Sequence, residues 1–97
     1  MRKYGKVDAN QAQIVKYIRN AGATVQSIAS VGSGCPDIIV GYRGKNWLFE
    51  IKDGSRPPSQ QKLTSDEELW HEICRGQVAV VNHAMQALEI IGAVKKQ

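Results

Sequence analysis

The apolar residues that follow the first few positions of the chain recur at the spacing of a helix. They are Ile14, Val15, Ile18 and Ala21. A repeat every three or four residues places them on one helix face. Asp8 is a good N-cap, and Gly22 is a typical residue at a helix end. The pattern therefore predicts a helix from Asp8 to Ala21 with one buried face.

The next 30 residues carry patterns that are typical of strands. In 23–30 apolar and polar residues alternate imperfectly, with a slip after Gln26, whereas 37–42 contains a continuous apolar run. A third strand is expected at 47–53. Because only 43–46 separates the last two strands, we expect them to form an antiparallel hairpin.

A second helix, a fourth strand and a closing helix follow. Thr64 with Glu67 three residues later forms a capping-box signature, which predicts a helix from Thr64 to about Arg75. The run at 77–82 is a short buried strand. The closing helix starts near Ala84 and places four apolar residues near one face: Met85, Leu88, Ile91 and Val94. The order α-β-β-β-α-β plus a helix predicts an α/β fold with a small mixed sheet flanked by helices.

Composition limits the size and class of the protein. The 97 residues fit a single domain, 1–97, and 42% hydrophobic with 23% charged residues is typical of a globular protein. The small core favours a homodimer. A net charge of +4 is compatible with a polyanionic partner without demonstrating one.

Two further expectations concern the compartment. Cys35 and Cys74 lack metal-type spacing, and we expect both to be reduced thiols. No run approaches the roughly 20 apolar residues of a membrane span, so we expect no membrane partner and a cytoplasmic location.

The strongest chemical signal lies at the ends of the predicted hairpin. Asp37 precedes the apolar run, while Glu50 and Lys52 alternate on the next strand and so share one face. Mg²⁺ prefers oxygen ligands, which Asp37, Glu50 and the carbonyl of Ile51 would supply. Lys52 would orient a water, act as a general base or stabilise the pentacovalent phosphate, and the sequence does not choose among these roles.

On its own, a Glu-x-Lys pair on a strand is usually a surface ion pair that contributes little to stability. Here Pro36-Asp37, the apolar run and the hairpin spacing all accompany the Glu50–Lys52 pair. This combination favours a metal-dependent site over the surface pair.

These motifs resemble a known nuclease superfamily. The matching residues are Gly34-x-Pro36-Asp37, Glu50-Ile51-Lys52-Asp53-Gly54, Pro57-Pro58-Ser59, Lys62-Leu63-Thr64, Trp70-His71 and Gly76-Gln77-Val78-Ala79-Val80-Val81. Over residues 8–88 the chain is similar to the PD-(D/E)xK nucleases, and in particular to the stand-alone VRR-NUC domains of phages and bacteria. The resemblance implies a restriction-endonuclease-like αβββαβ core. It also implies Asp37 and Glu50 as ligands of Mg²⁺ or Mn²⁺, Lys52 as the catalytic lysine, and a homodimer that cuts branched DNA such as Holliday junctions.

The chain departs from the family pattern at two places. Many relatives carry a glutamate on the first helix, where this chain offers Asn10, Gln11 and Gln13. These amides can orient a metal-bound water but add no negative charge, which places a second metal in doubt. Relatives also often carry a glutamine early in the second helix, and Glu67 stands at about that position. Glu67 is either a helix cap or a participant in the site.

Several cations and aromatic residues are weaker candidates. Arg43, Lys45 and Arg56 lie on turns expected near the site, where they would contact phosphates. Similar contacts are open to Lys6, Lys16 and Arg19. Trp70 and His71 would face DNA. Trp70 is otherwise a core or dimer-interface aromatic, and His71 is otherwise a solvated or hydrogen-bonded histidine, less often a metal ligand or catalytic residue. Two other readings are a non-catalytic DNA-binding or assembly module with this fold, and an endonuclease that nicks duplex DNA.

Overall fold

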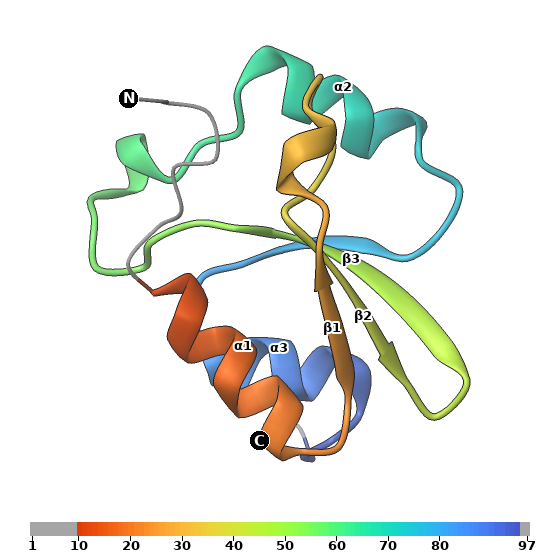
Figure 1. Ribbon diagram of the computed structural model, residues 1–97. Coiled ribbons are helices and arrows are strands. Elements are labelled where there is room, and N and C mark those ends of the chain that lie inside the picture. The colour runs from red at the N-terminus through yellow and green to blue at the C-terminus, as the bar shows by residue number, and fades with distance from the viewer. Residues whose placement is uncertain (1–9, 96–97) are drawn as a thin grey trace.

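The computed structural model describes residues 10–95 and contains the predicted order of helices and strands (Figure 1). Two short 3-10 turns, η1 and η2, are added to that order. The elements are α1 (Gln11–Asn20), β1 (Thr24–Ser27), η1 (Ala29–Val31), β2 (Ile38–Tyr42), β3 (Lys45–Ile51), η2 (Pro58–Gln60), α2 (Ser65–Ile73), β4 (Val78–Val81) and α3 (Ala84–Ile91).

The four strands form one mixed sheet in the order β1-β2-β3-β4. The first three are antiparallel, and β4 runs parallel to β3 after the α2 crossover. The hairpin turn is tighter than predicted, because only Arg43 and Gly44 separate β2 from β3. Both residues have positive φ, 51° and 81°, the conformation of a two-residue hairpin turn. As a result, β3 starts at Lys45 and not at Trp47.

One face of the sheet is covered by α1 and α3, which lie side by side in Figure 1 and contact each other. The buried residues include Ile14 and Ile18 from α1, and Val40 and Phe49 from the sheet. Alternation along β3 therefore turns Phe49 toward this core and its neighbour Glu50 toward the opposite face. The α/β class predicted from the sequence, with helices flanking a small mixed sheet, is confirmed.

The structure corrects several element boundaries. The N-cap of α1 is Asn10, and the predicted cap Asp8 lies outside the described residues. The first strand ends at Ser27 and not at residue 30, because the 3-10 turn η1 begins at Ala29 and the amide of Val31 donates back to the Ile28 carbonyl. The second helix has the predicted capping box but ends at Ile73, short of Arg75.

The closing helix differs from its predicted pattern at both ends. Met85 is exposed, although Leu88 and Ile91 are buried as predicted. Gly92, with φ of 84°, ends α3 before Val94, which therefore lies outside the helix. Cys35 and Cys74 are both free, as expected. Within residues 10–95 no helix has the length and apolar character required to cross a membrane.

Candidate functional site

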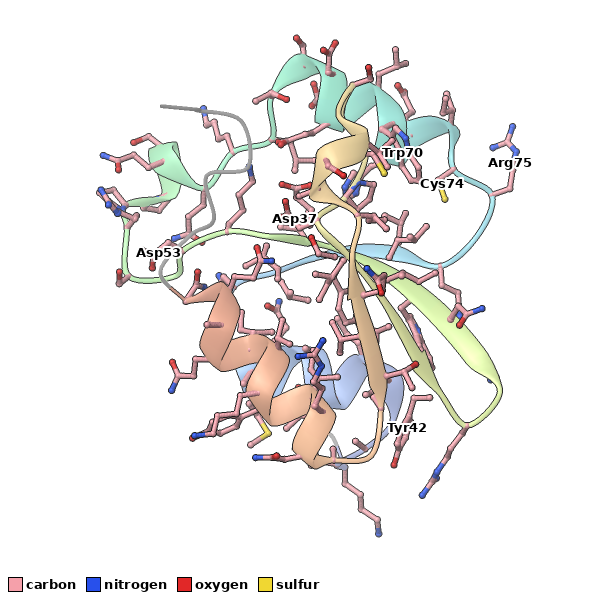
Figure 2. All side chains as sticks on the ribbon, viewed as in Figure 1. Asp37, Tyr42, Asp53, Trp70, Cys74 and Arg75 are labelled. Carbon is pink, nitrogen blue, oxygen red and sulfur yellow. The ribbon has the colours of Figure 1, made fainter. Side chains whose placement is uncertain are left out.

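The register of the hairpin brings Asp37 next to Glu50. Ile38 pairs with Phe49 in that register, so Asp37, the residue before Ile38, lies near Glu50, the residue after Phe49. The amide of Asp37 donates to the Phe49 carbonyl at 3.0 Å. The Asp37 carboxylate in turn accepts a hydrogen bond from the amide of Ile51 at 2.7 Å. Asp37 is thus fixed to the end of β3, as the sequence predicted, and Figure 2 shows it below α2.

Glu50 is the most deeply buried charged residue of the described chain, with 4% of its surface exposed. Its Oε1 atom is buried without a hydrogen-bond partner, and its Oε2 atom lies 3.7 Å from Nζ of Lys52. Burial raises the pKa of Glu50 to about 9, helped by the nearby carboxylates of Asp37 and Glu67. Burial also raises the pKa of Asp37. The surroundings of the site therefore do not fully stabilise the negative charge that the two acids would carry if both were ionised.

Lys52 connects the end of β3 to α2. Its ammonium donates to Oε1 of Glu67 at 3.0 Å, a shorter contact than the one to Glu50. Burial by itself would lower the pKa of Lys52, but the hydrogen bond and charge of Glu67 outweigh it and raise the pKa. Lys52 therefore remains an ammonium at neutral pH. Of the three roles left open by the sequence, charge stabilisation fits this state better than general base catalysis does.

Glu67 is both a helix cap and a member of the site. Burial would raise its pKa, but hydrogen bonds from the Thr64 amide and from Lys52 lower it, so Glu67 is a carboxylate. Its Oε1 atom accepts a hydrogen bond from the Thr64 amide at 2.9 Å. The amide of Glu67 in turn donates to Oγ1 of Thr64 at 3.2 Å. The sequence left open whether Glu67 is a helix cap or a participant in the site, and the two roles are compatible.

The three amides expected to support the metal lie in different environments. Asn10 uses its Nδ2 atom to bind the carbonyls of Lys52 at 2.8 Å and Asn82 at 3.2 Å, joining the ends of β3 and β4. Its Oδ1 atom is buried without a partner. Gln11 is buried and lines a cavity of about 520 Å³ between α1 and β1, whereas Gln13 is exposed. Asn10 is the one of the three that bonds directly to a residue of the site.

The cations of the hairpin turn do not lie where the sequence predicted. Tyr42 pairs with Lys45 at one end of the hairpin, while Asp37 and Glu50 lie at the other. At roughly 3.3 Å per residue the two ends are about 15 Å apart. Arg43 instead lies over the ring of Tyr42 at 5.2 Å. The expectation that Arg43 and Lys45 lie near the site is therefore wrong.

Arg56 follows the site on the loop after β3. Its Nε atom lies 3.5 Å from a carboxylate oxygen of Asp53, and its side chain is exposed. Of the three cations predicted to contact DNA, Arg56 is the one close to the site along the chain. A role in phosphate contact stays a prediction for all three.

His71 lies closer to the site than the sequence indicated. It follows Glu67 by four residues on α2, so the two side chains share one helix face. Its Nε2 atom is buried without a partner. Burial lowers the pKa of His71, while the charges of Glu67 and Lys52 act in opposite directions. The signal that was available in the sequence is this four-residue spacing from Glu67.

Trp70 contacts His71, and Cys35 borders the carboxylates. The Trp70 ring lies edge-on to the His71 ring, with centroids 6.5 Å apart, and Figure 2 shows Trp70 near Cys74, the residue that follows the end of α2. Burial raises the pKa of the Cys35 thiol, as do the charges of Glu50 and Asp37. The sequence predicted Cys35 to be a reduced thiol but gave no indication that it borders the carboxylates.

The oxygen donors of the site suit a divalent metal. Among residues 10–95 no group of three or more His, Cys, Asp or Glu side chains is gathered as a ready-made metal site. Mg²⁺ needs fewer protein ligands than that, since water and substrate complete its shell. The unpartnered, buried Oε1 of Glu50 fits such a role. The Ile51 carbonyl projects from the same strand edge as the Ile51 amide that binds Asp37. These donors fit a hard cation.

Comparisons with protein families, with curated proteins and with solved structures found no match to this chain. The α/β class is therefore established by the structure alone, and membership of a nuclease family stays a prediction. What the chain itself provides is a cluster of Asp37, Glu50, Lys52 and Glu67 at one end of the hairpin.

Proposed function

We propose that this protein is a metal-dependent nuclease of the PD-(D/E)xK type that hydrolyses phosphodiester bonds of DNA. The observation that carries the proposal is the buried Glu50 carboxyl group beside Asp37, with the Lys52 ammonium 3.7 Å away. A buried acid with an unpartnered oxygen is costly for a fold of this size. Such a cost is typical of sites retained for function.

Each group has a distinct role in the proposed chemistry. Asp37, Glu50 and the carbonyl of Ile51 would hold Mg²⁺ or Mn²⁺. The metal, when bound, supplies a more acidic water and neutralises charge that develops on the phosphate. Lys52, held as an ammonium, adds positive charge beside the phosphate oxygens as they become more negative. The hydrogen bond from Ile51 to Asp37 fixes that carboxylate before the substrate arrives.

The DNA substrate and the oligomeric state are also part of the proposal. The net charge of +4 favours a polyanion. A homodimer would place two sites around a two-fold axis, which suits paired cuts in branched DNA such as a four-way junction. A cytoplasmic location is also part of the proposal. The dimer is contradicted if the purified protein is monomeric at micromolar concentration.

The test is cleavage of end-labelled linear, flap, fork and four-way DNA with Mg²⁺, Mn²⁺ or EDTA. We expect cleavage with either metal, no cleavage in EDTA and a preference for branched DNA. Lys52→Ala should lower the rate about a hundredfold or more, while Lys62→Ala, which removes an ammonium that is exposed and not part of the site, should retain the wild-type rate. Full activity in Lys52→Ala would refute the site assignment.

One observation favours a second candidate, a non-catalytic DNA-binding or assembly module. The first turn of α1 carries no acidic residue, so the site lacks the carboxylate that many relatives place there. This candidate predicts that the protein slows the migration of DNA on a native gel in EDTA and in Mg²⁺ alike, and that no cut product appears. Equal cleavage of linear and four-way DNA would instead favour the endonuclease that nicks duplex DNA.

A further inference from the structure

One oxygen of Glu67 links the first turn of α2 to Lys52. Oε1 of Glu67 accepts two hydrogen bonds, one from the Lys52 ammonium at 3.0 Å and one from the Thr64 amide at 2.9 Å. The same glutamate donates its own amide to the Thr64 hydroxyl. The capping box therefore fixes both the backbone and the side chain of Glu67. A carboxylate held this way is a rigid partner for a flexible lysine.

The start of α2 is itself held close to the metal-binding end of the hairpin. Gly34, three residues before Asp37, lies so close to α2 that a Cβ atom added to it would collide with the backbone of Asp66. None of the α2 residues is buried, so the helix is not anchored by a hydrophobic face. The contacts of its first turn with Gly34 and Lys52 therefore set where Glu67 stands.

We propose that Glu67 is the positioning residue for Lys52, holding the ammonium through the capped first turn of α2. The inference rests on the proposed function, because it assigns the geometry of that same site. Lys52 has two acidic neighbours, Glu67 at 3.0 Å and Glu50 at 3.7 Å. Without Glu67, the ammonium is free to move onto Glu50 and to compete there with the metal.

This arrangement predicts a specific kinetic effect. In Glu67→Ala the lysine loses its fixed partner, and kcat should fall about tenfold to a hundredfold because a displacement of about 1 Å is enough for such a loss. The KM for DNA should change by less than about threefold, since Glu67 itself binds no phosphate. Glu68→Ala is the matched control: it removes an exposed acid from the same helical turn and should leave both constants unchanged.

Conservative variants of Glu67 distinguish its effect on the position of Lys52 from its effect on the stability of α2. Glu67→Gln keeps the oxygen that accepts both hydrogen bonds, and glutamine is also accepted in a capping box. We expect it to retain kcat within about threefold of the wild type. Glu67→Asp remains favourable in the first turn of a helix but is one methylene shorter. It should lose the contact with Lys52 and show the fall in kcat expected for Glu67→Ala. Glu67→Asp therefore supplies the test if the alanine variant does not fold.

A readout independent of cleavage is the side-chain order of Lys52, measured by ¹³C relaxation of its Cε methylene group. The order parameter should fall in Glu67→Asp and Glu67→Ala and stay at the wild-type value in Glu67→Gln and Glu68→Ala. An unchanged order parameter in Glu67→Asp together with an unchanged kcat would overturn the inference while leaving the nuclease proposal intact. If the wild type cuts no DNA with any metal, the nuclease proposal fails, and the relaxation data alone decide whether Glu67 positions Lys52.

Discussion

The burial of Glu50 predicts an unusual dependence of stability on pH. In the folded protein its pKa is raised from 4.5 to about 9. Between these values the unfolded chain has lost the Glu50 proton while the folded chain keeps it. Folding therefore takes up a proton, and the free energy of unfolding falls as the pH rises through this window. Replacement of Glu50 by glutamine, which carries no charge at any of these pH values, removes the effect.

The size of the effect follows from the linkage relation. One proton taken up on folding changes the free energy of unfolding by about 1.4 kcal/mol per pH unit. From pH 6 to pH 7.5, wild type should therefore lose up to about 2 kcal/mol relative to Glu50→Gln. Asp37, whose pKa is also raised, lowers stability with rising pH in the wild type and in Glu50→Gln alike, so it does not by itself create the difference. Glu67, with a lowered pKa, contributes mainly below its ordinary value of 4.5, and Lys52 mainly above 10.5.

Urea unfolding in EDTA, followed by the fluorescence of Trp47 and Trp70, measures this difference at both pH values. Glu68→Gln serves as the control, because it removes an exposed acid and should follow the wild type. If Glu50→Gln differs from the wild type by the same free energy at pH 6 and at pH 7.5, Glu50 is ionised in the fold. The reasoning from its burial would then be refuted.

Three other predictions test the surroundings of this carboxyl group. Mg²⁺ at ten times its dissociation constant should stabilise the wild type by about 1.4 kcal/mol in thermal unfolding, and it should not stabilise Glu50→Gln. Gly34→Ala places a side chain at a positive φ of 85° and against the backbone of α2. We expect it to lower the free energy of unfolding by about 1–3 kcal/mol, measured in urea. Gly44→Ala, which has open space around it, should lower that free energy by less. Arg43→Ala with Lys45→Ala should leave kcat unchanged and weaken DNA binding with a shallower salt dependence, and a loss of kcat would contradict their distance from the site.

The sequence contains enough information for the hairpin part of the site. Asp37 directly precedes β2, Glu50 lies on β3, and Lys52 directly follows β3. Local rules of strand alternation and register bring the three residues together. The same rules place Arg43 and Lys45 at the turn end of the hairpin, opposite the end that holds Asp37 and Glu50. The expectation that they lie near the site was wrong because it followed closeness in sequence. A turn that is close in sequence to a site is not close in space when a whole strand separates them.

The contribution of α2 was not available from such local rules. Glu67 lies 15 positions after Lys52 in the sequence, beyond a loop and the start of α2, and its capping signature gives its place on the helix but not its partner. The close approach at Gly34 that brings α2 to the hairpin is a tertiary contact. A glycine in a Gly-x-Pro-Asp motif predicts a turn, and nothing in the sequence says that a helix packs against it.

The charges of the site explain why a divalent cation suits it better than additional basic side chains. With Asp37, Glu50 and Glu67 ionised and Lys52 protonated, three negative charges meet one positive charge, and the site carries a net charge of −2. In the metal-free protein Glu50 reduces this excess by keeping its proton, which its raised pKa reflects. A divalent cation would bring the same four groups to neutrality and release that proton. The overall charge of +4 cannot do so, because cations such as Arg43 and Lys45 lie at the far end of the hairpin.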